Sequence, residues 1–253
     1  MSVVHGGLGD HERASLPGGA AIVDLSANLH PDGPPPAVIA AIREAAAPAA
    51  LGRYPSVDAA PLREAIAAHH GVAPESVVVT PGASAAIALA LGALLAPGDR
   101  CAVFEPTFGE YARAAEAAGA TVVSATAGEP RFDLAEPPPA DFAVLCNPNN
   151  PTGRVVPRRT VETLLRRVRA LVIDAAYEAL GAGAWDATAL VRAGAPVVVV
   201  HSLTKLFAMP GVRLGYLVAP PALAAAVRAQ QPPWPVGALE IAAGRSAIAG
   251  FEA

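Results

Sequence analysis

The chain has 253 residues, of which 53% are hydrophobic and 16% charged, so it can form a sizeable core without disulfides. Its formal net charge of -4 argues against a nucleic-acid-binding surface, because such a surface needs a basic face. No uncharged apolar run reaches transmembrane length, and the first ten residues hold no signal-peptide core, so we expect a cytoplasmic protein without a membrane span.

Short β-branched runs alternate with alanine-rich stretches along the chain. Strands are predicted at 76–80, 101–105, 121–124, 142–146, 170–174, 196–201 and 213–218. Helices are predicted at 36–47, 60–70, 84–95, 108–118, 159–168, 221–230 and 236–248. This alternation indicates βαβ units and an α/β fold, with a mostly parallel sheet of about seven strands covered by helices on both faces.

Cys101 and Cys146 lie in apolar runs, which predicts two buried free thiols. No metal-ligand spacing is found, so no metal is expected. Polar segments follow five of the predicted strands. They occupy 80–84, 105–108, 147–153, 174–177 and 202–205. Ligands of such sheets bind beyond the carboxyl ends of the strands, so these five segments are expected to form one site.

Lys205 comes just after the apolar run at 198–200. A lysine beyond the end of a buried strand can lose its hydration and act as a nucleophile toward carbonyl groups. One such group is the aldehyde of pyridoxal 5'-phosphate (PLP). Lys205 could form a Schiff base with this aldehyde and later move the substrate's Cα proton as a general base. An isolated lysine would more simply be a surface residue, but four other strand-end motifs accompany this one.

Four other residues could contact the pyridine ring. Asp174 ends a predicted strand and could pair with a protonated pyridine nitrogen, although a helix N-cap is the alternative. Tyr177 and Asn150 could hydrogen-bond the phenolic oxygen, unless they are a half-buried tyrosine and a turn residue. Phe108 could stack on the ring or could belong to the core.

A phosphate group would need donors at the same edge. Gly82, Ala83 and Ser84 open a predicted helix, whose N-terminus offers backbone N–H groups and a positive dipole. The Ser202 hydroxyl and the Arg213 guanidinium could add hydrogen bonds. Considered alone, Gly82 would be an ordinary turn residue and Ser84 an ordinary helix N-cap.

Three motifs together carry a family resemblance: Asn150-Pro151-Thr152-Gly153, Asp174-x-x-Tyr177, and Ser202-x-x-Lys205 followed by Arg213-x-Gly215. In order and spacing they resemble the class I/II aminotransferases, the fold-type I PLP enzymes, from about residue 20 to residue 248. The resemblance implies a three-layer αβα sandwich, the large domain of PLP transferases. It also implies that Lys205, Asp174, Asn150 and Tyr177 hold the cofactor in the roles given above. Tyr54 in Arg53-Tyr54-Pro55 would reach the PLP phosphate of a partner subunit, which implies a homodimer.

The N-terminal arm resembles one branch of the family. His5-Gly6-Gly7 and the segment 24–31 are similar to threonine-phosphate decarboxylases of cobalamin biosynthesis, whose relatives are histidinol-phosphate aminotransferases. In that branch the arm faces the substrate, so the resemblance makes His5, Gly6 and Asn28 candidate substrate contacts. The substrate is then an amino acid or a phosphorylated amine. Decarboxylation of threonine phosphate is the first expectation, and transamination of a histidinol-phosphate-type amine is the alternative.

The same resemblance divides the chain into three parts. Residues 1–45 are expected to form the N-terminal arm and part of a small domain, 46–235 the PLP-binding large domain, and 236–253 the start of a C-terminal small domain that is otherwise missing. The arginine that grips a substrate carboxylate would lie in that domain and cannot be named. A PLP-binding sensor or a non-catalytic fragment is the alternative to an enzyme, although no basic helix-turn-helix of a transcription regulator is present.

Overall fold

The computed structural model describes residues 6–7, 15, 24 and 26–252. Its strands are β1 (Val77–Thr80), β2 (Arg100–Glu105), β3 (Thr121–Thr126), β4 (Phe142–Cys146), β5 (Ala170–Asp174), β6 (Val197–Ser202) and β7 (Gly215–Val218). They form one sheet of seven strands in the order β1-β7-β6-β5-β4-β2-β3. Strand β7 runs antiparallel to β1 and β6, and the other neighbours are parallel. The predicted seven-stranded, mostly parallel sheet is confirmed.

The helices follow the predicted order with small shifts at their ends. They are α2 (Pro36–Ala45), α3 (Pro48–Leu51), α4 (Ala60–His70), α5 (Ala83–Leu94), α6 (Glu110–Ala117), α7 (Arg158–Leu165), α8 (Thr188–Arg192), α9 (Leu203–Leu206), α10 (Pro221–Ala229) and α11 (Ala238–Ala249). Single 3-10 turns are η1 (Pro74–Ser76), η2 (Glu178–Leu180) and η3 (Gly250–Glu252). The sequence did not predict α3, α8 and α9, because one turn of helix is too short to show an apolar period.

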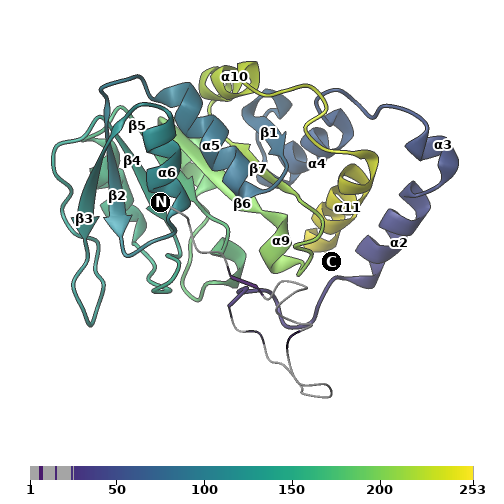
Figure 1. Cartoon of the computed structure of the whole chain (residues 1–253), viewed down its shortest axis with the longest axis horizontal. Coiled ribbons are helices and arrows are strands. Elements are labelled where there is room, and N and C mark those ends of the chain that lie inside the picture. Colours follow the sequence, from purple (N-terminus) through teal and green to yellow (C-terminus); the bar gives the residue numbers. More distant parts are fainter. Residues whose placement is uncertain (1–5, 8–14, 16–23, 25, 253) are drawn as a thin grey trace.

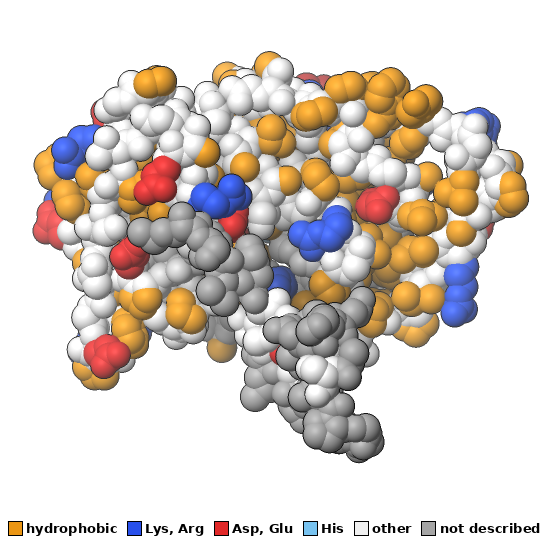
Figure 2. All heavy atoms as spheres, viewed as in Figure 1, with side chains coloured by type: hydrophobic (Ala, Val, Ile, Leu, Met, Phe, Trp, Pro, Cys, Tyr) orange, Lys and Arg blue, Asp and Glu red, His pale blue; other side chains and the backbone are white. Residues whose placement is uncertain are grey.

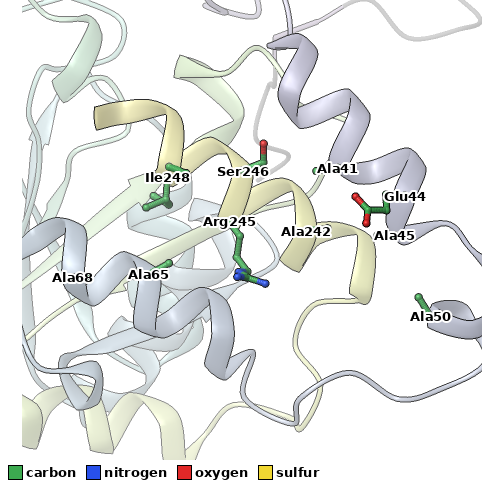
Figure 3. Close-up of a pocket in the computed structure, with 11 residues that line it drawn as sticks. Ala41, Glu44, Ala45, Ala50, Ala65, Ala68, Ala242, Arg245, Ser246 and Ile248 are labelled. Carbon is green, nitrogen blue, oxygen red and sulfur yellow. The ribbon is translucent and has the colours of Figure 1, made fainter. Parts of the chain in front are cut away.

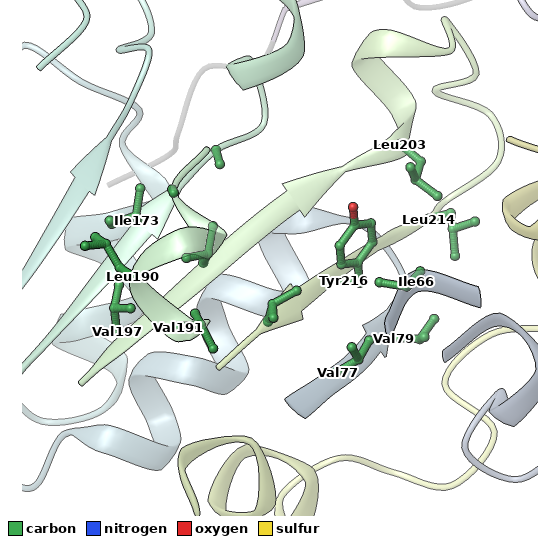
Figure 4. Close-up of a cluster of buried hydrophobic side chains, with 14 of the residues drawn as sticks. Ile66, Val77, Val79, Ile173, Leu190, Val191, Val197, Leu203, Leu214 and Tyr216 are labelled. Carbon is green, nitrogen blue, oxygen red and sulfur yellow. The ribbon is translucent and has the colours of Figure 1, made fainter. Parts of the chain in front are cut away.

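Apolar side chains pack on both faces of the sheet, which makes three layers (Figure 1). Along β6, Val197 and Val199 belong to one core cluster, whereas Val198 and Val200 belong to the other. Successive strand residues point to opposite faces, so a run of valines is what a doubly covered strand requires. Figure 4 shows the first cluster, to which α4, α7, α8 and α11 contribute. Helices α5, α6 and α10 cover the second.

Helix α11 packs against α2 and α4, so a helix near the end of the chain lies beside two helices from its first third. Gly244 permits the close approach, since a Cβ there would lie 2.7 Å from a methyl carbon of Leu214 and 2.8 Å from one of Leu62. The predicted boundaries at residues 45 and 235 stay predictions.

The surface carries scattered charges of both signs. On the face drawn in Figure 2, Lys and Arg side chains alternate with acidic and apolar ones and do not gather into one basic area. Within the described part of the chain, no helix has the length and apolar character needed to cross a membrane.

Candidate active site

The ends of β5 and β6 bring Asp174 and Lys205 together. The two strands are parallel neighbours, with Asp174 opposite Val200, and Lys205 lies in α9, which begins directly after β6. The Asp174 carboxylate acts to raise the pKa of the Lys205 ammonium, so the two groups are electrostatically coupled. The carboxyl ends of parallel strands share one edge of the sheet, and this edge holds the candidate site.

The Lys205 side chain is half-buried under the N-terminal arm. Burial lowers the pKa of its ammonium, and the nearby Arg213 charge lowers it further. Its Nζ donates a hydrogen bond of 2.9 Å to the Ala27 carbonyl. The backbone N–H of His30 donates to the Lys205 carbonyl at 3.0 Å. The arm is therefore tied to α9 at two points, beside an amine that loses its proton more readily than a free lysine does.

Asp174 is buried, and its carboxylate accepts two hydrogen bonds. The Tyr111 hydroxyl donates to Oδ2 at 2.7 Å, and the Ala176 N–H donates to Oδ1 at 3.0 Å. Burial raises the pKa of Asp174, whereas the bond from Tyr111 lowers it. The ionised form would thus gain from a cation placed against it, which is what a protonated pyridine nitrogen provides. Sequence reasoning missed Tyr111, although it stands only three positions after Phe108, within the helix predicted at 108–118.

A cavity of about 510 Å³ lies beside these strand ends, and Asn28, Asn150 and Tyr177 line it. The Asn28 side chain shares a hydrogen bond with the Tyr177 hydroxyl. Asn28 has a φ of 50°, in the left-handed region that asparagine tolerates better than most residues. The structure therefore joins an arm residue predicted to contact substrate with a residue predicted to contact cofactor.

The candidate phosphate donors meet at the N-terminus of α5. Gly82 has a φ of 94°, and a Cβ there would lie 2.8 Å from Nη2 of Arg213, so the guanidinium covers this turn. A Cβ on Gly215 would lie 2.7 Å from the Ala83 nitrogen. The missing side chains of the two glycines therefore let the Arg213 guanidinium and the Ala83 backbone come close together at the start of α5. Ser84 is half-buried in the first turn of α5, which no side chain caps.

Two further predicted contacts lie at other strand ends. The Ser202 hydroxyl, at the end of β6, lies 2.7 Å from the Thr204 hydroxyl. Phe108 is half-buried, and its ring meets the edge of Tyr111 at a centroid distance of 5.7 Å.

The remaining predicted residues lie on the arm and the surface. The Tyr54 side chain is 81% exposed, and its ring stacks on Trp234 at 4.6 Å. Gly6 lies against Ser26, where a Cβ would come within 1.9 Å of the Ser26 carbonyl oxygen. His5 lies outside the described residues.

A carboxylate, a coupled amine, two side chains facing a cavity and an anion cradle fit the groups of PLP. The model of the family "Aminotransferase class I and II" matches residues 20–252. The chain belongs to the class I and II aminotransferase family. Enzymes of this family depend on PLP, as the resemblance implied.

Relatives of known structure or curated sequence cover most of the chain. The histidinol-phosphate aminotransferase of Symbiobacterium thermophilum is 34% identical over 239 residues, which are 91% of this chain and 66% of the relative. That of Paramagnetospirillum magneticum is 36% identical over 245 residues, covering 93% and 67%. The crystal structure of L-threonine-O-3-phosphate decarboxylase from Porphyromonas gingivalis gives a TM-score of 0.77 at 28% identity, covering 89% of this chain and 72% of that chain. The chain thus spans about two thirds of the length of these curated relatives.

A larger cavity of about 780 Å³ lies between α2, α4 and α11, away from the strand ends (Figure 3). Arg245 points from α11 toward α4 in this cavity. Arg192 instead binds Asp186 and donates to the His70 carbonyl at 2.9 Å. Neither arginine lines the cavity that Asn150 and Tyr177 line.

Proposed function

We propose that the chain is the cofactor-binding part of a PLP-dependent enzyme that acts on an amino acid or a phosphorylated amine, with Lys205 as the Schiff-base residue. One observation carries the proposal. Lys205 is the only lysine among 253 residues, and it lies half-buried in α9, directly after β6, where its charge interacts with that of Asp174 at the end of β5. The other residues counted among Lys and Arg are all arginines. A guanidinium stays protonated and cannot attack an aldehyde.

Bound PLP supplies an electron sink for the bonds at the substrate's Cα. In this proposal Asp174 keeps a proton on the pyridine nitrogen, and Tyr177 and Asn150 hydrogen-bond the phenolic oxygen. Phe108 holds the ring flat. Lys205 would act as the base for a proton at the substrate's Cα, and the burial that lowers the pKa of its ammonium would favour this role.

The phosphate is assigned to the turn at the start of α5. Gly82, Ala83 and Ser84 offer backbone and hydroxyl donors there, and Ser202 adds a second hydroxyl. Arg213, whose guanidinium covers Gly82, adds charge-assisted bonds. A positive helix end and an arginine at the same place are suited to a dianion.

Two reactions are candidates. Transamination of a histidinol-phosphate-type amine comes first, because both curated relatives named above are histidinol-phosphate aminotransferases with more than 30% identity. Decarboxylation of threonine phosphate, as part of cobalamin biosynthesis, comes second. It is supported by the similarity to the Porphyromonas gingivalis decarboxylase and by Asn28, which the arm places on Tyr177. The expectation from the sequence had the opposite order.

The proposal includes a homodimer in a reducing compartment, the cytoplasm. The exposed Tyr54 side chain is available to a second copy of the chain, whose PLP phosphate it would contact. Both cysteines are buried free thiols, which suits a cytoplasmic protein.

The single lysine allows a sharp test. We expect PLP to give a visible absorption band with the wild-type protein, and borohydride reduction to leave one cofactor adduct that peptide mass spectrometry places on Lys205. The K205R variant keeps the positive charge but cannot form the Schiff base, so it should lose the band and the adduct. Only the terminal amine could then react.

A wild-type adduct that maps to the terminal amine, and that K205R forms to the same extent, would refute the role of Lys205. If wild-type protein forms the adduct, adding an amine substrate separates an enzyme from a sensor or a non-catalytic fragment. An enzyme should show a substrate-dependent spectral change and release product, namely glutamate from 2-oxoglutarate for a transaminase or carbon dioxide for the decarboxylase.

A further inference from the structure

Tyr111 is fully buried and touches two of the candidate cofactor residues. Its hydroxyl donates to Oδ2 of Asp174 at 2.7 Å, and its ring meets Phe108 edge-on. It comes from α6, which covers the sheet face opposite α4 and α11. One helix side chain therefore contacts both the residue assigned to the pyridine nitrogen and the residue assigned to the ring face.

In this contact the Tyr111 hydroxyl is the hydrogen-bond donor and the Asp174 carboxylate is the acceptor. Burial raises the pKa of Tyr111 well above its usual value, and the Asp174 charge raises it further, so the phenol keeps its proton and donates. Burial raises the pKa of Asp174 above its usual value, which favours the neutral acid, and the hydrogen bonds from the Tyr111 hydroxyl and the Ala176 N–H limit this rise. A neutral acid could not hold a proton on a pyridine nitrogen by ion pairing.

We propose that Tyr111 is a positioning residue for the cofactor: its hydroxyl orients the Asp174 carboxylate and keeps it ionised, so that the carboxylate can pair with the protonated pyridine nitrogen. This inference rests on the proposed function and deepens it. Tyr111 does not touch the reacting atoms. It acts through Asp174, and its ring supports Phe108.

Cys146 extends the contact toward the asparagine loop. Its thiol interacts with the Tyr111 hydroxyl and donates to the Pro148 carbonyl at 3.2 Å. The backbone of Asn150 also hydrogen-bonds this sulfur. Tyr111 is thus linked through one buried atom to the loop that carries the candidate ligand of the phenolic oxygen.

The titratable groups that interact with the Asp174 charge come from four places in the fold. They are Tyr111 on α6, Cys146 on β4, Tyr177 after β5 and Lys205 on α9. The Lys205 charge lowers the pKa of Asp174, as does Tyr111, so either can be removed separately in a variant. Only the loss of the Tyr111 hydroxyl leaves the Schiff-base amine in place.

The test compares Y111F with Y216F. Tyr216 is also buried, and its hydroxyl shares a 2.9 Å hydrogen bond with Nε2 of His70 rather than with Asp174. Both variants remove one buried hydroxyl and keep the ring. Y111F should weaken PLP binding about tenfold or more, the loss expected for a hydrogen bond to a charged group. Y216F should bind PLP as wild type does.

Two spectroscopic readouts separate positioning from packing. In cofactor-free protein, carboxyl ¹³C NMR should show that Asp174 titrates at higher pH in Y111F than in wild type. With PLP, the pH dependence of the visible band should shift in Y111F and not in Y216F. Equal titration of Asp174 in wild type and Y111F would overturn the proposal.

Failure of this inference differs from failure of the proposed function. If wild-type protein lacks a Lys205-dependent band, the function fails. If the band is present and Y111F matches Y216F in cofactor affinity and pH profile, only the role of Tyr111 fails. Should Y111F not fold, the wild-type protein still decides, because an Asp174 carboxyl that NMR finds protonated at neutral pH would also overturn the proposal.

Discussion

Three asparagines of the loop after β4 differ in what their side chains contact. Asn147 is buried, accepts from the Val156 N–H at 2.8 Å and donates to the Val156 carbonyl at 3.3 Å. Asn149 donates to the Pro106 carbonyl and to the Thr152 hydroxyl, both at 2.9 Å. Asn150 faces the cavity that Tyr177 lines. The first two side chains hold the loop in shape, which leaves the third for a ligand.

This division of roles predicts opposite effects of two alanine substitutions. N147A leaves the buried Val156 N–H without its acceptor and should lower the free energy of unfolding by about 1–3 kcal/mol. N150A should change stability by less than about 0.5 kcal/mol and weaken PLP binding instead. Urea unfolding and PLP titration of both variants check this. An N150A protein with wild-type affinity for PLP would contradict the assignment of Asn150.

At the scale of elements, β7 fixes the place of the turn before α5. A Cβ on Gly215 would meet backbone atoms on two sides, the Ala83 nitrogen at 2.7 Å and the His201 carbonyl oxygen at 2.9 Å. Since backbone cannot rotate aside as a side chain can, the start of β7 sets the distance between the α5 turn and β6. Arg213, two residues before Gly215, reaches Gly82 from this position.

We expect G215A to disturb the proposed phosphate site as well as the fold. The added methyl group should push the α5 turn away from β6, costing about 1–3 kcal/mol of stability and reducing the affinity for PLP. Gly128 is the control, because nothing lies within 4 Å of a Cβ there, and G128A should match wild type in both measurements. Thermal unfolding measures the stability of both variants, and PLP titration measures their affinity for the cofactor. Unchanged affinity in a folded G215A protein would argue against this phosphate site.

At the scale of the whole molecule, a cavity of about 80 Å³ joins α4, β6, α9, β7 and η2, and titratable groups line it. Burial raises the pKa of Glu178 to about 7. Burial also lowers the pKa of His70 to about 4. From about pH 4.5 to 7 the folded chain holds the Glu178 proton more tightly than the unfolded chain, so this contribution to stability falls as the pH rises. His70 acts in the opposite sense, and its contribution falls as the pH drops from 6.5 to about 4.

The E178Q variant should therefore gain stability relative to wild type as the pH rises. Glutamine has no proton to lose, so the difference in unfolding free energy should change by up to about 3 kcal/mol between pH 4.5 and 8. Urea unfolding at several pH values measures this difference. Parallel curves for the two proteins would show that Glu178 titrates alike in the folded and unfolded chains.

Much of the architecture could be predicted because it repeats along the chain. The valine run of β6 and the apolar helices on either side of it follow local periods, and each strand-end residue stands directly after such a run. Tyr111 could not be predicted, because its contact with Asp174 joins positions 63 residues apart. For the same reason no sequence pattern paired Asn28 with Tyr177.

By itself, the sequence determined the order of the strands and helices, the family and the residue types at each strand end, because those depend on local periodicity and on motifs of fixed spacing. Only the tertiary structure decided how the three loop asparagines divide between holding the loop and lining the cavity, which carboxylate the Tyr111 hydroxyl meets and which arm carbonyl accepts from Lys205. Those outcomes depend on how the layers pack, since burial and distance between remote segments, rather than residue identity, set the ionisation and partners of each side chain.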